Sequence, residues 1–265
     1  MTLRSGLGAA RRLVLSSFSC RLGRMQNQTP VVSFCFDDFP RTAYRTGGAI
    51  LKQFGARGTY YAAPGLMNTS NDLGEQFTAD DLEMLLRDGH EVGCHTYSHI
   101  SCRNVSFKAF EADVVKGRET LRVMTGRDPL NFAYPFGHVS FVAKRKIGAK
   151  MKTCRGIYGG LNGPNPDLNL LAANSLYGDV DGVATYESLI SANQQSNAWL
   201  IFYTHDVRDN PSPFGCTPAL LEKVVALAVA RGLHVAPVQE VANSMDAVQV
   251  EAVSQQKHGS PAQIS

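Results

Sequence analysis

The segment that most restricts the fold is Val31 to Asp38, with the sequence Val-Val-Ser-Phe-Cys-Phe-Asp-Asp. Its first six residues are apolar or small, and several are β-branched or aromatic, which indicates a strand buried on both faces. Such strands are typical of parallel sheets covered by helices, as in α/β proteins. In these folds the chemistry is placed at the carboxyl ends of the strands. Asp37 and Asp38 occupy that position, although with Pro40 they would also suit an ordinary polar turn.

Further short apolar segments alternate with helical patterns as far as Pro237. We expect strands at 58–63, 91–94, 131–135, 150–154, 170–176, 198–204 and 233–237. Expected helices cover 42–54, 106–124, 141–146, 186–194 and 218–230, and another begins after the cap Thr78 and stops at Gly89. Seven or eight strands alternating with helices favour a single α/β barrel, and a chain of 265 residues is long enough for one.

The two ends of the chain differ in composition from its middle. No repeat or linker divides 29–246, so we expect one domain there, an Arg-rich arm at 1–28 and a disordered polar tail at 247–265. The apolar stretch Leu13 to Phe18 is too short and too rich in serine for a signal peptide. No run approaches the about 18 apolar residues that span a membrane. We therefore expect a cytoplasmic protein, with a targeting role for the arm left open.

Composition narrows the possible partners. A hydrophobic content of 44% with 18% charged residues is ordinary for a soluble enzyme. The net charge of +3 is small and scattered, which gives no reason to expect nucleic-acid binding. The cluster 144–146 (Lys-Arg-Lys) suits a solvated helix face. The six cysteines form no Cys-x-x-Cys pair, so we expect reduced thiols rather than zinc ligands.

A histidine pair follows the expected strand 91–94, in the sequence His95-Thr96-Tyr97-Ser98-His99. Histidines spaced i, i+4 lie on one face of a helix, within reach of one ion. A single carboxylate would complete a three-ligand site with an open position, as in catalytic zinc sites. Imidazole and carboxylate also suit cobalt or nickel. A His-x-x-x-His pattern is common by chance, however, and does not establish a metal site alone.

Two other strand ends also carry polar or aromatic groups. His205-Asp206 follows the strand 198–204, and 131–135 leads into Tyr134-Pro135-Phe136-Gly137. His205 alone could equally be a buried, satisfied histidine. In a closed parallel sheet, however, all these strand ends meet at one rim.

Together these motifs resemble the NodB-type polysaccharide deacetylases, carbohydrate esterase family four. The resemblance rests on Phe-Asp-Asp after a strand, His-Thr-Tyr-Ser-His, a Phe-x-x-Pro-aromatic-Gly turn and a strand ending in His-Asp, and it covers about Val31 to Val241. It implies a NodB homology domain, a distorted (β/α) barrel of about seven strands. It also implies hydrolysis of an N-acetyl, sometimes O-acetyl, group on a sugar.

The resemblance also implies roles for individual residues. The metal ligands would be Asp38, His95 and His99, and the metal a divalent ion, most often zinc. Asp37 would be the general base toward metal-bound water, and His205 would protonate the leaving amine. The backbone N–H of Phe136 would stabilise the oxyanion. The residues expected to contact substrate are Tyr134, Pro135, Phe136, Arg155 and Tyr203.

The chain departs from the family pattern in places. Ala133 stands where many members have an arginine that orients the base; Arg155 could supply that charge, or it could anchor a loop. Tyr203 replaces a leucine that commonly borders the acetyl methyl group. Asp179 or Asp181 is a candidate to tune His205.

The leading hypothesis is a metal-dependent deacetylase of an amino sugar or oligosaccharide, for example a chitooligosaccharide or a glycan precursor. A sugar deformylase or another carbon–nitrogen amidase on the same fold is the first alternative. A glycan-binding relative that has lost turnover is the second, and the complete set of base, ligands and acid argues against it.

Overall fold

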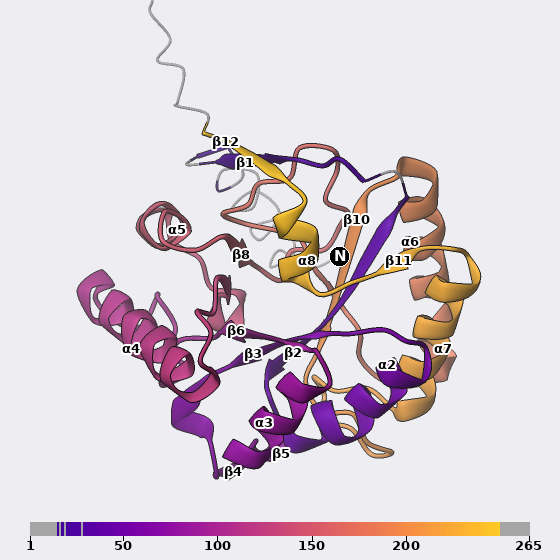
Figure 1. Cartoon of the computed structure of the whole chain (residues 1–265), viewed down its shortest axis with the longest axis horizontal. Helices are drawn as coiled ribbons and strands as arrows, with labels where there is room; N and C mark the ends of the chain where they lie inside the picture. Colours follow the sequence, from indigo (N-terminus) through magenta and orange to yellow (C-terminus); the bar gives the residue numbers. More distant parts are fainter. Residues whose placement is uncertain (1–14, 16, 19, 28, 250–265) are drawn as a thin grey trace, which may run out of the picture.

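The computed structural model describes residues 15, 17–18, 20–27 and 29–249. Its centre is an eight-stranded sheet in which every pairing is parallel (Figure 1). Seven strands follow the order β8-β7-β6-β3-β2-β10-β9, and β11 pairs with the start of β2. Their bounds are β2 Val31–Asp38, β3 Thr59–Ala62, β6 Glu91–Cys94, β7 Asn131–Ala133, β8 Thr153–Arg155, β9 Asn174–Ser175, β10 Trp199–Thr204 and β11 His234–Val235.

The sheet curls until its two ends are joined by the segment 168–175. Leu171 bridges to Arg155 of β8, and Asn174 pairs with Phe202 of β10. The predicted strand 170–176 is therefore shortened to β9, because its first residues bond to β8 instead, as in Leu171 N–H to Cys154 O at 2.8 Å. The predicted single, distorted (β/α) barrel is confirmed.

Strand β2 has one face toward the helices and one toward the barrel interior. Val32, Phe34 and Phe36 pack into the core beneath the outer helices. Val31 and Cys35 belong to a second apolar cluster inside the barrel. Because side chains alternate along a strand, Asp37 lies on the same interior face as Cys35. The alternation thus places a carboxylate inside the barrel at the strand's carboxyl end.

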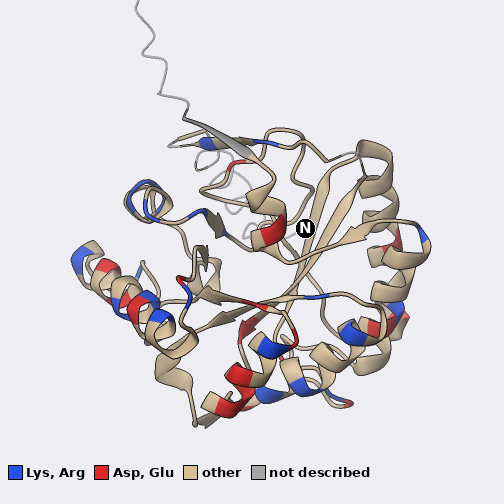
Figure 2. Cartoon of the chain, viewed as in Figure 1, with Lys and Arg blue, Asp and Glu red and all other residues tan. Residues whose placement is uncertain are grey.

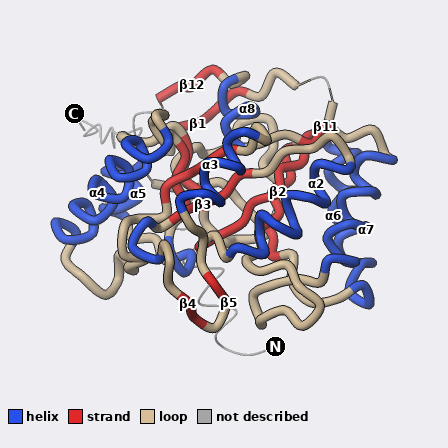
Figure 3. The backbone as a smooth tube through the Cα atoms, turned by 60° about the horizontal axis from the view of Figure 1, so that its bottom comes forward, coloured by secondary structure: helices blue, strands red, loops and turns tan. Residues whose placement is uncertain are grey.

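Helices cover the outside of the sheet (Figures 1 and 3). They are α2 Ala49–Gln53, α3 Ala79–Arg87, α4 Phe107–Thr125, α5 Phe141–Gly148, α6 Val183–Ser196 and α7 Pro218–Ala230. The expected helix 42–54 is present, but its first part, Ala43–Gly48, is π-helical. The predicted cap of α3 is confirmed: Thr78 and Asp81 form a reciprocal capping box.

The short helix α8 (Val238–Asn243) closes the barrel at the end where the strands begin. Its first two N–H groups donate to Thr59 Oγ1 and Glu91 Oε2, at 2.9 and 2.7 Å. Thr59 and Glu91 are the first residues of β3 and β6. The candidate functional site lies at the opposite end of the barrel, where the strands finish.

Three expectations about the chain ends and surface are wrong in part. Strand β1 (Arg21–Arg24) pairs antiparallel with β12 (Asp246–Gln249), so the predicted arm and tail both contribute to the folded structure. Backbone pairing, which needs no apolar pattern, explains why neither strand was expected. Arg21 Nη2 adds hydrogen bonds to Met151 O and Lys152 O, at 2.7 and 2.6 Å. Most of the predicted arm (1–14) and tail (250–265) lies outside the described residues.

The third expectation that is wrong in part is that the basic cluster 144–146 lies on a solvated helix face. Lys144 is fully buried, and its ammonium pairs with Asp167 Oδ2 at 2.6 Å. Elsewhere, α3 and α4 both carry acidic and basic residues along their length (Figure 2). Within the described part of the chain, we find no helix of the length and apolarity that crossing a bilayer requires.

Candidate metal and catalytic site

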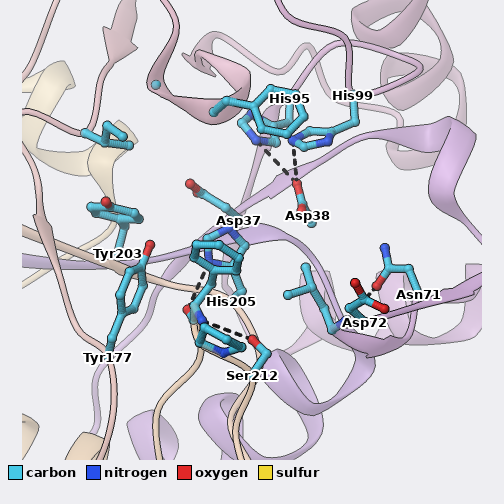
Figure 4. Close-up of a pocket in the computed structure, with 16 residues that line it drawn as sticks. Asp37, Asp38, Asn71, Asp72, His95, His99, Tyr177, Tyr203, His205 and Ser212 are labelled. Atoms are coloured by element: carbon cyan, nitrogen blue, oxygen red, sulfur yellow. Dashed lines mark hydrogen bonds and ion pairs between the residues drawn. The ribbon is translucent and has the colours of Figure 1, made fainter. Parts of the chain in front are cut away.

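A cavity of about 550 Å³ opens where the strands of the barrel end (Figure 4). Residues at or just after the carboxyl ends of β2, β6, β7 and β10 line it, together with the hairpin of β4 (Ser70–Asn71) and β5 (Gly74–Glu75). Asp37, Asp38, His95, His99 and His205 all face this one space. Its volume lies within the range of about 300–1,000 Å³ usual for small-molecule sites.

Asp38, His95 and His99 converge at one side of the cavity. Asp38 Oδ1 lies 3.4 Å from His95 Nε2 and 3.0 Å from His99 Nε2. One potential ligand atom from each residue lies within 4.8 Å of the other two. Asp38 Oδ1 is buried and has no hydrogen-bond donor among the described residues. A buried carboxylate oxygen facing two imidazole nitrogens is a donor set that a divalent cation would satisfy.

The protonation of the two imidazoles favours the same interpretation. Burial lowers the pKa of His95 to about 3 and that of His99 to about 4, so both are neutral near pH 7. His95 Nδ1 lies 2.7 Å from Ala133 O, and a carbonyl can only accept, so Nδ1 carries the proton. The lone pair of His95 Nε2 therefore points toward Asp38. Burial also raises the pKa of Asp38 to about 6.

The spacing of the histidine pair suggested a helix, but the two residues do not lie on one. Residues 95–99 form an irregular turn, in which Thr96 and His99 have left-handed φ angles of 64° and 52°. Asp38 and Phe136, with φ of 63° and 58°, share this conformation. For residues other than glycine it costs on the order of 1–3 kcal/mol each, and such residues cluster at functional sites.

Asp37 is held by a buried arginine from across the barrel. Arg155 Nη2 donates to Asp37 Oδ1, and both side chains are almost fully buried. The guanidinium carbon lies 4.8 Å from the ring centroid of Tyr61 and 5.1 Å from that of Tyr203. Burial alone would raise the pKa of Asp37, but Arg155, helped by His95 and His205, brings it below its ordinary value. Arg155 thus supplies the positive charge next to Asp37 that an arginine in place of Ala133 would otherwise provide.

His205 is oriented by a backbone carbonyl. Its Nδ1 lies 3.0 Å from Phe214 O, and its own N–H donates to the same oxygen at 3.2 Å. Buried Asp206 holds this loop by accepting the N–H of Ser212 at 2.8 Å.

Neither carboxylate suggested for tuning His205 does so. Asp179 accepts hydrogen bonds from Val180 N–H and Thr217 Oγ1, at 2.6 and 2.8 Å. It therefore starts a helical turn, and Asp181 is an exposed residue within that turn. Neither of them lines the cavity.

The five residues expected to contact substrate divide into two groups. Phe136 and Tyr203 line the cavity. Tyr134, Pro135 and Arg155 are buried and do not line it, so for these three the structure gives no support to direct substrate contact. Pro135 begins the turn that exposes Phe136, whose ring lies 4.5 Å from that of His99.

Some lining residues were not anticipated. Tyr177 and Phe214 form an aromatic wall beside His205, with ring centroids 6.1 Å apart. No motif marks them. Asp72 lies in the turn of the hairpin 70–75, where no strand was predicted; the Asn-Asp-Leu-Gly sequence at 71–74 is a turn signal that could have indicated it.

Comparisons with known proteins point to polysaccharide deacetylases as similar proteins. The family model described as polysaccharide deacetylase matches residues 24–152. A peptidoglycan-N-acetylglucosamine deacetylase of Bacillus cereus is 26% identical over 115 residues, which are 43% of this chain and 50% of that protein. The match thus spans half the length of that relative.

Solved structures share the fold. The chitin deacetylase of the fungus Colletotrichum lindemuthianum has a TM-score of 0.59 at 19% identity, over 82% of this chain and 89% of that one. A family 4 acetyl xylan esterase of Clostridium thermocellum, in complex with a cobalt ion, has a TM-score of 0.55 at 19% identity, over 80% and 90%. The family model and the peptidoglycan deacetylase both show that the chain is similar to polysaccharide deacetylases over about half of its length, and the solved structures show that it shares their fold.

Proposed function

We propose that the protein is a metal-dependent hydrolase that removes the N-acetyl group of an amino sugar or a short oligosaccharide. One observation supports this above all. A buried carboxylate oxygen without a hydrogen-bond partner faces two neutral imidazoles, in the same cavity as a paired carboxylate and a third histidine. These are the parts that metal-assisted amide hydrolysis needs.

Asp38, His95 and His99 would hold the cation. Zinc suits one carboxylate and two imidazoles, and cobalt or nickel would also be accepted. When bound, such a cation supplies Lewis acidity, which polarises the acyl oxygen and acidifies a water molecule.

The remaining side chains move protons. Asp37, kept ionised by Arg155, would accept a proton from the attacking water. His205 keeps Nδ1 on Phe214 O and so presents Nε2 to the cavity, from which it would protonate the leaving nitrogen. Water adds to the carbonyl carbon and the carbon–nitrogen bond breaks. Acetate and a sugar with a free amine are the products.

The cavity walls are compatible with a sugar substrate. Phe136 and Phe214 are 55% and 54% exposed and border the cavity, so their rings can pack on the faces of sugar rings. The relatives named above act on peptidoglycan N-acetylglucosamine and on chitin, as their names state. We therefore propose an N-acetylglucosamine unit within a short oligosaccharide as the substrate. The cytoplasm is the location that we propose for the protein.

The direct test is acetate release from short chitin fragments by protein loaded with Zn²⁺. We expect acetate from the loaded protein and none from protein stripped with a chelator, with activity restored by Zn²⁺. The matching N-formyl sugars separate a deacetylase from a deformylase. Equal release by stripped and loaded protein would contradict metal dependence, and a preference for the formyl sugars would favour the alternative.

His205→Ala tests the proposed acid. The variant should slow cleavage of the amide far more than cleavage of an activated acetyl ester, because a phenolate leaves without a proton and an amine does not. The ratio of the two kcat/KM values reports this difference without depending on the amount of active protein. Equal losses on both substrates would contradict the role of His205 as an acid.

A further inference from the structure

We infer that Asp113 of α4 is a positioning residue for the metal site. It would hold the turn between His95 and His99 in the conformation that brings both imidazoles to Asp38. The inference rests on the proposed function, because it takes these three residues as metal ligands. Asp113 itself does not line the cavity and belongs to no motif in the sequence.

The contacts of Asp113 reach the middle of the turn. Its Oδ1 accepts the N–H groups of Tyr97 and Ser98, each at 2.9 Å. The N–H of Tyr97 also lies 3.1 Å from the backbone oxygen of Asp113. Hydrogen bonds from backbone N–H groups to a carboxylate are roughly twice as strong as those between neutral groups. One side chain thus fixes two successive peptide groups between the histidines.

The turn needs such support because its backbone is unfavourable. Thr96 has a left-handed φ of 64°, although it is β-branched, and His99 has a φ of 52°. Within the turn, Thr96 Oγ1 accepts the N–H of Ile100 at 3.3 Å. These conformations persist only where surrounding contacts enforce them. Without the carboxylate of Asp113, the N–H of Ser98 would lose this acceptor, and the N–H of Tyr97 would keep only the backbone oxygen of Asp113.

Helix α4 approaches the turn closely enough to make these bonds only because residue 117 is glycine. A Cβ atom at Gly117 would lie 2.5 Å from both the carbonyl carbon and the oxygen of Thr96. These are backbone atoms, which cannot rotate away as a flexible side chain could. Glycine inside a helix is normally unfavourable. Here it permits the contact between the helix and the ligand turn.

The experiment is a measurement of Zn²⁺ affinity by competition with a chromogenic chelator. Asp113→Ala should weaken Zn²⁺ binding by about 10- to 100-fold, the usual cost of removing a group that supports metal ligands. Asp113→Asn should fall in between, because its amide oxygen can still accept the two N–H groups without the charge. Gly117→Ala should also weaken binding, because the helix or the turn must move.

Glu111→Ala is the matched control. Glu111 lies on the same helix two residues away, and it pairs with Lys150 at 2.7 Å rather than with the turn. Its loss should leave Zn²⁺ affinity unchanged. Melting of the zinc-free proteins is measured in parallel, since a residue that only stabilises the fold would lower the Tm without changing the Zn²⁺ affinity.

The possible failures are distinguishable. If His95→Ala binds Zn²⁺ as the unmodified protein does, the ligand assignment and the proposed function fail. If His95→Ala loses Zn²⁺ but Asp113→Ala does not, only the role of Asp113 is refuted. If Asp113→Ala does not fold, Asp113→Asn and Gly117→Ala decide, and unchanged affinity in both would overturn the inference.

Discussion

Asp37→Asn is expected to slow deacetylation by about two to four powers of ten, the usual contribution of general acid–base catalysis, while Zn²⁺ affinity stays nearly unchanged. Asparagine keeps the shape of the side chain and can still accept a hydrogen bond from Arg155. It cannot take a proton from water. Asp37 is not among the three groups that converge on the proposed ion, so the metal should remain.

The measurement is kcat and KM for acetate release, with metal content determined on the same samples. Asp72→Asn is a suitable control, because it makes the same change at another carboxylate that lines the cavity, on the hairpin rather than beside the ligands. We expect any effect of that control to fall on KM and not on kcat. A normal kcat for Asp37→Asn would remove Asp37 from the mechanism.

The part of the site that lies on strand ends could be predicted from sequence. The apolar run of β2 ends in Asp37-Asp38, and the apolar strand β10 ends just before His205. The carboxyl ends of parallel strands lie at one edge of the sheet, so a correct assignment of the strands was enough to predict that these residues lie close together. The barrel followed from the same alternation of strands and helices.

The conformation of the His95–His99 turn could not be predicted in this way. Its spacing of four residues matches one helical turn, but Thr96 adopts a left-handed φ that its residue type disfavours. The reason lies in contacts with α4, which begins eight residues after His99 in the chain. A pattern of residue types carries no information about such a tertiary contact.

Ion pairs between residues far apart in the chain could not be predicted from the sequence either. Arg155 and Asp37 are 118 residues apart, and they meet because the barrel interior between β2 and β8 is narrow enough for a long side chain to cross. The sequence offered Arg155 as a candidate but equally as a loop anchor. Lys144 shows the same limit, since only the position of Asp167 explains why a lysine in a basic cluster is buried.

The largest expected effect on stability is that of Arg155→Met in the metal-free protein. Removing one partner of a buried ion pair costs about 3–5 kcal/mol, because the remaining charge is left without compensation. Methionine fills much of the space between Tyr61 and Tyr203, so lost packing should contribute little. The free energy of unfolding is measured with urea at several pH values.

The dependence of this loss on pH identifies its cause. In the unmodified protein the pKa of Asp37 lies below its unfolded value of about 3.9, so the stabilisation by the pair is present above that pH and lost as the pH falls through the folded pKa. In Arg155→Met, burial dominates and the folded pKa of Asp37 should lie above the unfolded one. The variant then loses stability as the pH rises, and the difference between the two proteins is largest near pH 7. The other ionisable groups are the same in both proteins, so their contributions nearly cancel in this difference.

Adding Asp37→Asn to Arg155→Met removes the uncompensated charge, so the double variant should be more stable than Arg155→Met alone at pH 7. At acidic pH the two should converge, because Asp37 is then already neutral in the single variant. A difference between Arg155→Met and the unmodified protein that did not vary with pH would mean that packing, and not the charge of Asp37, is what Arg155 contributes. Arg155 would then have no part in keeping the carboxylate proposed as the base ready to accept a proton.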